Sequence, residues 1–267
     1  MKCIFFFLFL ITLNASAQPT IEYNKSAERK LDLGDYQGAI DDYNIFIKKN
    51  SSNIKAILYR GDAKYGLGDY LGAMQDYNKV ITLDYKNARA LSSRASTKES
   101  LRDYRGALLD YDVAVKLDPT ETDYLINRGG IKVTLKDYDG AFKDYNHALE
   151  LRLKYDFVYL KLSELKSEIK DYNGAIEYCN KAISINPKNA DAFWKRGNIK
   201  DNIGDPQGAM KDYNESLKLK PNAYLFFNRG LIKYELGDKT GACLDWSKSG
   251  ELGNSSAYDT IKEKCNK

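Results

Sequence analysis

The sequence predicts an all-α solenoid, because one twelve-residue pattern occurs seven times and each copy is typical of a turn that joins two helices. The pattern begins as LGDYQGAIDDYN at Leu33 and ends as the divergent copy LGDKTGACLDWS at Leu236. Its Asp-x-x-Gly-Ala block recurs at a step of 34 residues five times running, and the last step, from Asp205 to Asp238, is 33. A fixed period of this length is typical of repeats that bury their apolar faces only against their neighbours.

One repeat, residues 54–87, shows how the pattern predicts two helices. Apolar positions at helical spacing precede Gly68, which can adopt the left-handed conformation that ends a helix. Asp69 can then cap the next helix by accepting a backbone N–H bond, which contributes about 1 kcal/mol. Later connections contain prolines, which cannot continue a helix. These prolines are Pro119, Pro187 and Pro221.

The repeats resemble those of tetratricopeptide repeat (TPR) proteins over residues 20 to 253, nearly the whole mature chain. The matching features are the 34-residue period, the Gly-Asp-Tyr turn, a small residue in the first helix, an Ala in the second helix and an aromatic residue four positions later. The second-helix alanines are Ala39, Ala73, Ala107, Ala141, Ala175, Ala209 and Ala242. The aromatic residues are Tyr43, Tyr77, Tyr111, Tyr145, Tyr213 and Trp246, with Cys179 in this position once. The resemblance implies a right-handed superhelix of antiparallel helix pairs, with a concave groove lined by the first helices.

The N-terminal residues 1–17 are predicted to be a secretory signal peptide. Lys2 precedes an apolar run, and Ala15 and Ala17 give small residues before the expected cleavage at Gln18. The run is about 11 residues long, whereas a membrane span needs roughly 20. We therefore expect an exported protein, periplasmic or secreted, without membrane insertion after cleavage. The expected repeats are about 20–53, 54–87, 88–121, 122–155, 156–189, 190–222 and 223–253, followed by a capping helix at 254–267.

Two charged positions recur along the repeats. An Arg precedes the small first-helix residue in five repeats, and an Asp precedes the second-helix aromatic in six. The fifth repeat lacks both and has Leu162 and Tyr178 instead. Their joint loss favours ion pairs within repeats, such as Arg60 with Asp76, which brace the two helices. The alternative is a charged ladder that binds a partner.

Two further positions recur in every repeat. A Lys lies five residues before each capping Asp, as Lys64 does before Asp69, and the spacing suggests a Lys–Asp pair at each turn. The alternative is a basic stripe for an acidic partner. A Gly, such as Gly72, precedes each second-helix Ala. Since Gly within a helix costs about 0.5–1 kcal/mol relative to Ala, we expect close approach of the paired helices there.

Composition and motifs argue against several functions. The net charge of +4 comes from 41 basic and 37 acidic residues spread along the chain, which does not favour nucleic-acid binding. The single His147 has polar neighbours, no His/Cys cluster has metal-ligand spacing, and nothing places a nucleophile beside a base. We therefore expect a protein that is not an enzyme and that carries no metal or cofactor.

The cysteines of the mature chain have different expected roles. Cys179 occupies the aromatic position of its repeat and is expected to be buried. Cys243 and Cys265 could form a disulfide that fixes the capping helix if their Cα atoms lie within about 7 Å. The sequence leaves open whether they are bonded.

The first helices supply the candidate groove residues, most of them in the C-terminal third. An aromatic side chain with polar neighbours is a plausible anchor for a partner. For Phe227 and Tyr234, packing against adjoining repeats is an equal alternative. The candidates are Arg89, Trp194, Asn198, Asp201, Asn202, Tyr224, Phe227 and Tyr234.

These observations favour an exported TPR interaction module that binds a protein or peptide in its groove. The alternative is a structural subunit of a cell-envelope assembly that uses the edges or ends of the solenoid. The partner and the oligomeric state cannot be inferred from the sequence.

Overall fold

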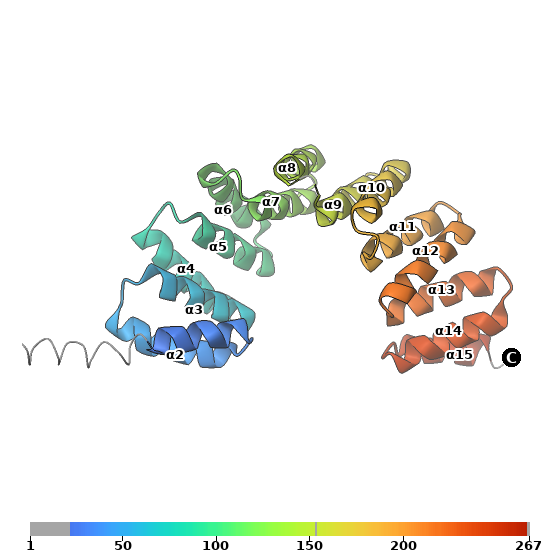
Figure 1. Ribbon diagram of the computed structural model, residues 1–267, viewed down its shortest axis with the longest axis horizontal. Helices are drawn as coiled ribbons and strands as arrows, with labels where there is room; N and C mark the ends of the chain where they lie inside the picture. The colour runs from blue at the N-terminus through green and yellow to red at the C-terminus, as the bar shows by residue number, and fades with distance from the viewer. Residues whose placement is uncertain (1–21, 153, 266–267) are drawn as a thin grey trace, which may run out of the picture. The chain divides into compact units, whose positions relative to one another are not determined.

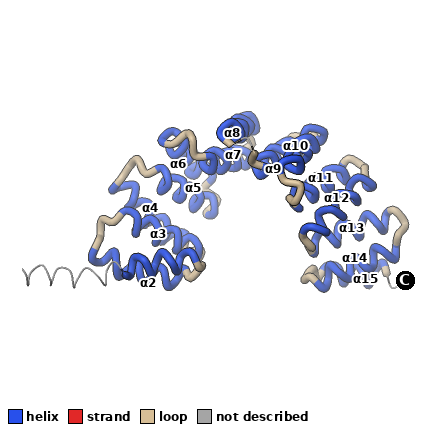
Figure 2. Tube along the Cα trace, viewed as in Figure 1, coloured by secondary structure: helices blue, strands red, loops and turns tan. Residues whose placement is uncertain are grey.

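The computed structural model describes residues 22–152 and 154–265 (Figure 1). Throughout these ranges the regular structure is helical (Figure 2). A helical segment at residues 22–32 precedes α2. The helices are α2 (Tyr36–Lys49), α3 (Ile54–Gly66), α4 (Tyr70–Leu83), α5 (Ala88–Ser100), α6 (Tyr104–Leu117), α7 (Thr122–Thr134), α8 (Tyr138–Leu151), α9 (Asp156–Glu168), α10 (Tyr172–Ile185), α11 (Ala190–Asn202), α12 (Pro206–Leu219), α13 (Ala223–Glu235), α14 (Lys239–Glu251) and α15 (Ser256–Lys264).

Among the described helices, none has both the length and the apolar character needed to cross a bilayer. The predicted signal peptide at residues 1–17 lies outside the described ranges.

The described chain forms two compact units, residues 22–144 and 145–265. In the first unit α3 packs against α4 and α5 against α6. In the second unit α9 packs against α10, α11 against α12 and α13 against α14. Each unit is thus a stack of helix pairs that are adjacent in the sequence, as Figure 1 shows. This arrangement confirms the predicted all-α solenoid.

The turns within the repeats have the predicted geometry. Gly68 takes a φ of 81°, and the Asp69 carboxylate accepts a 2.9 Å bond from the backbone N–H of Gly72. Some repeats place a residue other than Gly at the turn, and Arg102 has a φ of 62° there. Helix ending and helix capping are therefore both encoded within a few residues.

The core of every repeat except the fifth, which has Cys179, depends on an aromatic side chain that packs against a small residue of the paired helix. A Cβ atom added to Gly61 would lie 2.7 Å from the Tyr77 ring, and one added to Gly230 would lie 2.5 Å from the Trp246 ring. Both rings are almost fully buried. The close approach between paired helices therefore occurs at the small residue of the first helix.

The glycines that precede the second-helix alanines have a different role from the one predicted. A Cβ atom on Gly72 would lie 2.1 Å from the Asp69 carboxylate, and the other glycines at this position face their own capping Asp in the same way. Interhelical packing is therefore the wrong explanation. Gly is favoured here because the capping carboxylate folds back over the first turn of its own helix.

The Arg–Asp pairs within repeats are confirmed. Arg94 donates to Asp110 through Nε at 2.8 Å and Nη2 at 2.7 Å, and the Asp110 side chain is only 7% exposed. The Arg94 Nη1 atom donates to Asn78 of the preceding repeat at 2.7 Å. Each such Arg therefore joins the two helices of its own repeat and also contacts the repeat before it. The same Arg–Asp pairing occurs at Arg60–Asp76, Arg128–Asp144, Arg196–Asp212 and Arg229–Asp245.

The Lys residues pair with the buried Asp and not, as predicted, with the capping Asp. Lys98 lies 2.7 Å from Asp110, so this carboxylate contacts two cations. The buried Asp attracts the ammonium group more strongly because it is screened less by water than an exposed capping Asp. The fifth repeat shows the predicted pair, Lys166 with Asp171 at 2.8 Å, because Tyr178 replaces the buried Asp there.

The end of the second unit is closed by α15. Ala257 is buried, and Tyr258 covers Gly250 of α14. The structure links Cys243 to Cys265 by a disulfide, with the two Cα atoms 6.0 Å apart. The free Cys179 is buried beside Ser163, and burial raises the pKa of its thiol.

Candidate functional site

The junction between the sixth and seventh repeats differs from the others in the length of its connection. Residues 220–222 join α12 to α13, whereas four residues, 186–189, join α10 to α11. This shortening accounts for the single step of 33 residues. The helix α13 packs less closely against α12 than α11 does against α10. Three cavities lie around this junction, with volumes of about 720, 400 and 330 Å³.

The two smaller cavities lie between α11 and α13, which are the first helices of consecutive repeats. The cavity of about 400 Å³ is mainly apolar and is lined by Trp194, Tyr224 and Leu225. The cavity of about 330 Å³ is mainly polar. Its polar lining residues are Asn198, Asp201, Asn202, Tyr213, Asn228 and Glu235. Since Asn228 lines both cavities, we treat them as one site, the α11–α13 groove.

The polar part of this groove is acidic. Asp201 lies in the last turn of α11, and Glu235 is the last residue of α13. Burial raises the pKa of Asp201, and the negative charge of Glu235 raises it further. The carbonyl ends of both helices add negative potential at the same place. A cation would therefore be stabilised at this end of the groove.

A hydrogen bond fixes the orientation of the Asn198 side-chain amide. Its Oδ1 atom accepts a 2.7 Å bond from the hydroxyl of Tyr213, which is buried in α12. The amide nitrogen of Asn198 therefore remains as a donor toward the groove. Asn202 and Asn228 line the same cavity and supply further amide groups.

The corresponding face of the first unit has a smaller cavity, of about 250 Å³, whose two basic side chains both form ion pairs. Lys55 lies 2.8 Å from Glu28, and Arg89 lies 2.9 Å from Asp62. Both cations also stack over the Tyr59 ring. These side chains satisfy one another, so Arg89 does not present a free charge to a partner. It also belongs to the first unit, apart from the other predicted groove residues.

The sequence repeat explains why this pairing is absent from the sixth and seventh repeats. Asn198 occupies the position of Asp62, and Tyr224 occupies that of Arg89. The substitutions replace an ion pair by an amide and by an aromatic ring that is 70% exposed. The groove thus has chemical groups that are available to a partner where the first unit has an internal salt bridge.

The other predicted groove residues divide into two groups. Trp194, Asn198, Asp201, Asn202 and Tyr224 line the α11–α13 groove. Phe227 and Tyr234 instead pack against Trp246, with ring centroids 6.5 and 5.6 Å away.

Sequence reasoning did not single out Asn228 and Glu235. Their spacing from Tyr224, four and eleven residues along the same helix, places all three on one face.

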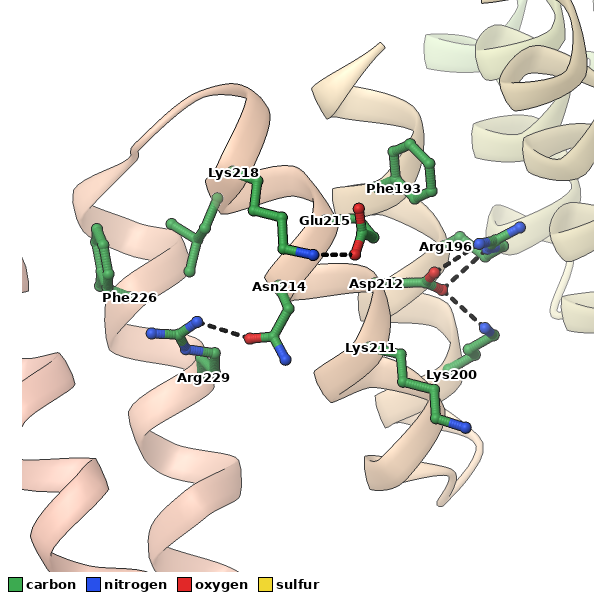
Figure 3. Close-up of a pocket in the computed structure, with 11 residues that line it drawn as sticks. Phe193, Arg196, Lys200, Lys211, Asp212, Asn214, Glu215, Lys218, Phe226 and Arg229 are labelled. Carbon is green, nitrogen blue, oxygen red and sulfur yellow. Dashed lines mark hydrogen bonds and ion pairs between the residues drawn. The ribbon is translucent and has the colours of Figure 1, made fainter. Parts of the chain in front are cut away.

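The cavity of about 720 Å³ lies beside the ion pairs and is lined by many charged residues (Figure 3). Arg196 and Lys200 bond to Asp212, Lys218 bonds to Glu215, and Figure 3 shows these pairs as dashed lines. Arg229 likewise donates to Asn214, so four of the five cationic side chains that line this cavity already have partners. The cavity is therefore a weaker candidate for an anionic ligand than the α11–α13 groove is for a partner. In the described chain no group of three or more His, Cys, Asp or Glu residues could hold a metal ion.

Comparisons with known proteins agree with the repeat pattern. Sequence profiles described as Tetratricopeptide repeat match residues 24–91 and residues 122–155, 158–189 and 190–222, which together exceed half of the chain. No protein of curated function matches the chain.

Solved structures share the fold. A tetratricopeptide repeat protein from Parabacteroides merdae is 24% identical, with 93% of this chain and 100% of that chain covered and a TM-score of 0.73. MamA is 26% identical over 60% of this chain and 94% of its own, with a TM-score of 0.54. YrrB, described as a TPR protein with an unusual peptide-binding site, is 19% identical over 70% of this chain and 97% of its own, with a TM-score of 0.51.

Proposed function

The chain belongs to the tetratricopeptide repeat family, and from this premise we propose that it is an exported interaction module that binds a peptide segment of a partner protein in the α11–α13 groove. Proteins of this family generally bind proteins or peptides. The observation that carries the assignment to this groove is the replacement of the Asp62–Arg89 ion pair by Asn198 and Tyr224. In this proposal the protein acts by binding and not by catalysis.

Two observations support export. The N-terminal sequence has the charge, apolar run and small residues of a signal peptide. The disulfide between Cys243 and Cys265 is a bond that forms and persists in oxidising compartments. The proposal predicts that the protein isolated from its own cells starts near Gln18, which N-terminal mass spectrometry would test.

The binding proposal can be tested by a crosslinking pull-down with the chain from residue 18 onward. One bait carries Trp194→Ala with Tyr224→Ala in the groove. A matched control carries Leu71→Ala with Tyr85→Ala, which removes apolar side chains that are 70% and 74% exposed in the first unit. A buried aromatic anchor at an interface contributes about 2 kcal/mol or more, which corresponds to roughly 30-fold in affinity.

The expected result is one dominant partner that the wild type and the control capture and the groove variant loses. Equal capture by all three baits would contradict groove binding. That result would favour the alternative in which the edges or ends of the solenoid join a larger assembly.

A further inference from the structure

We propose that the α11–α13 groove selects an extended peptide that carries a bulky apolar side chain and, about two to four residues away, a Lys or Arg. This inference rests on the proposed function, since it specifies the chemistry of the segment that the groove binds. It commits to a cationic segment of a partner protein. Acidic or uncharged segments, and a second copy of this chain, are outcomes that would overturn it.

The apolar cavity fits a large side chain. Its volume of about 400 Å³ lies between the half-buried Trp194 and the Tyr224 ring, which is 70% exposed. Leu225 forms part of its wall. A flat aromatic or branched aliphatic side chain would bury apolar area on both rings, and burial of that area is favourable by about 25 cal/mol per Å².

The charge of the groove determines which charge the second peptide side chain should carry. Within the described residues, Asp201 and Glu235 have no ion-pair partner, and no basic residue lines their cavity. The nearest basic residues along the two helices face elsewhere: Lys200 pairs with Asp212, and Lys233 pairs with Asp245. An incoming Lys or Arg would relieve the repulsion between the two carboxylates and complement both helix C-termini.

The other charged residues that line the groove do not change the negative charge of its polar end. Lys220 lines the apolar cavity, where Asp191 also lies, so the charges at that end are balanced. The polar end retains the net negative charge of Asp201 and Glu235. The groove is therefore apolar and nearly neutral at one end and acidic at the other.

The separation of the two cavities sets the spacing in the peptide. Trp194 and Asp201 are seven residues apart on α11, which corresponds to about 10 Å along a helix that rises about 1.5 Å per residue. An extended chain advances about 3.3–3.6 Å per residue. A peptide that runs along α11 would therefore cover this distance in about three residues. The flexible stem of Lys or Arg widens the range to about two to four.

Three amides lie where such a peptide backbone would pass. Asn198, with its oxygen bonded to Tyr213, can donate to a peptide carbonyl, and Asn202 and Asn228 can each donate and accept. These hydrogen bonds would hold an extended peptide backbone without distinguishing between its side chains. Selectivity would therefore come from the apolar cavity and from the two carboxylates.

The test is selection of displayed random octapeptides on the full chain from residue 18, followed by fluorescence anisotropy with the enriched peptides. A charge variant carries Asp201→Asn with Glu235→Gln; both residues are exposed, and both substitutions are nearly isosteric. A matched control carries Asp259→Asn with Glu263→Gln on α15, which removes the same net charge from exposed positions outside the groove. Circular dichroism verifies that each variant is folded.

The proposal predicts enriched peptides with an aromatic or large aliphatic residue and a Lys or Arg at the stated spacing. Their affinity should fall at least about tenfold with the charge variant and less than about twofold with the control. Replacing the peptide Lys or Arg by Gln should cause a similar loss of affinity for the wild type and little further loss for the charge variant.

Other outcomes overturn the inference in distinguishable ways. Enrichment of acidic or uncharged peptides that still require Trp194 would refute the charge assignment and leave the groove as the binding site. Enriched peptides that bind equally to a Trp194→Ala variant would refute the groove and the proposed function together. Concentration-dependent dimerisation that Tyr224→Ala abolishes, measured by sedimentation, would identify a second copy as the occupant.

Discussion

Replacement of Asp110 by Ala should be among the most destabilising single substitutions at a charged residue of this protein. The Asp110 carboxylate accepts two bonds from Arg94 and lies 2.7 Å from Lys98. The Arg94 and Lys98 side chains are only 20% and 19% exposed. Without Asp110, two largely buried cations lose their counter-charge. Breaking a buried ion pair from one side costs about 3–5 kcal/mol.

The same helix provides a matched control. Asp112 lies two residues further along α6 and pairs with Arg128 at 3.0 Å, but its side chain is 50% exposed. Because water screens this pair, Asp112→Ala should cost at most about 1 kcal/mol. The two substitutions remove the same atoms and the same charge, so their difference reports burial.

Urea unfolding followed by circular dichroism at 222 nm measures both costs. Amide hydrogen exchange in α5 and α6 would show whether the loss is local, as nearest-neighbour coupling in a repeat protein implies. A difference between Asp110→Ala and Asp112→Ala of less than about 1 kcal/mol would refute this account of the buried cluster. The double change Arg94→Leu with Asp110→Tyr, which copies the fifth repeat, should be less destabilising than Asp110→Ala because no Arg is left without its partner.

Three further outcomes follow from the structure. Replacing Cys243 and Cys265 together by Ser should lower the stability of the second unit by about 3 kcal/mol, because the bond closes a loop of 22 residues; an unchanged urea midpoint under non-reducing conditions would argue against the bond. Gly106→Ala should not gain the usual helix-propensity benefit of about 0.5–1 kcal/mol, since the added Cβ atom displaces the Asp103 cap, whose loss costs about 1 kcal/mol; a variant that is more stable by the full propensity gain in thermal unfolding would contradict it. Burial raises the pKa of Glu164, but bonds from Lys195 and Lys161 outweigh burial and hold that pKa below its ordinary value of 4.5. This carboxylate therefore stabilises the fold above about pH 4.5 and loses that effect as the pH falls through its folded pKa, so the destabilisation by Glu164→Gln in urea unfolding should be largest at pH 7 and should shrink steadily as the pH is lowered below 4.5.

The period, the turns and the Arg–Asp pairs could be predicted because the repeats allow the sequence to be compared with itself. Leu162 and Tyr178 replace both members of the pair in one repeat, and this joint loss identifies the partners from the sequence alone. Capping by Asp69 followed from purely local chemistry.

The Lys and Gly positions were misassigned because spacing along the chain does not reveal burial. Lys98 lies five residues before Asp103 and twelve before Asp110, but the more distant carboxylate is the buried one and it attracts the ammonium. Gly106 faces the carboxylate of its own cap, which bends back over the helix. Both outcomes depend on where side chains point in three dimensions.

The candidate groove could be located only in part. The step of 33 residues is visible in the sequence, but its effect, the looser packing of α13 and the cavities beside it, depends on tertiary contacts. Phe227 and Tyr234 share a helix with Tyr224, and only the position of Trp246 shows that their rings are packed.

Site-specific photocrosslinking tests the central claim most directly. A photoreactive benzoylphenylalanine replaces Tyr224 in one protein and Tyr85 in another; both tyrosines are exposed, at 70% and 74%, but only Tyr224 lines the groove. After incubation with an extract of the native cells and irradiation, mass spectrometry identifies the crosslinked peptides. We predict crosslinks from position 224 to one peptide segment of one partner, and few from position 85. Crosslinks from position 85 with none from position 224 would contradict binding in the α11–α13 groove.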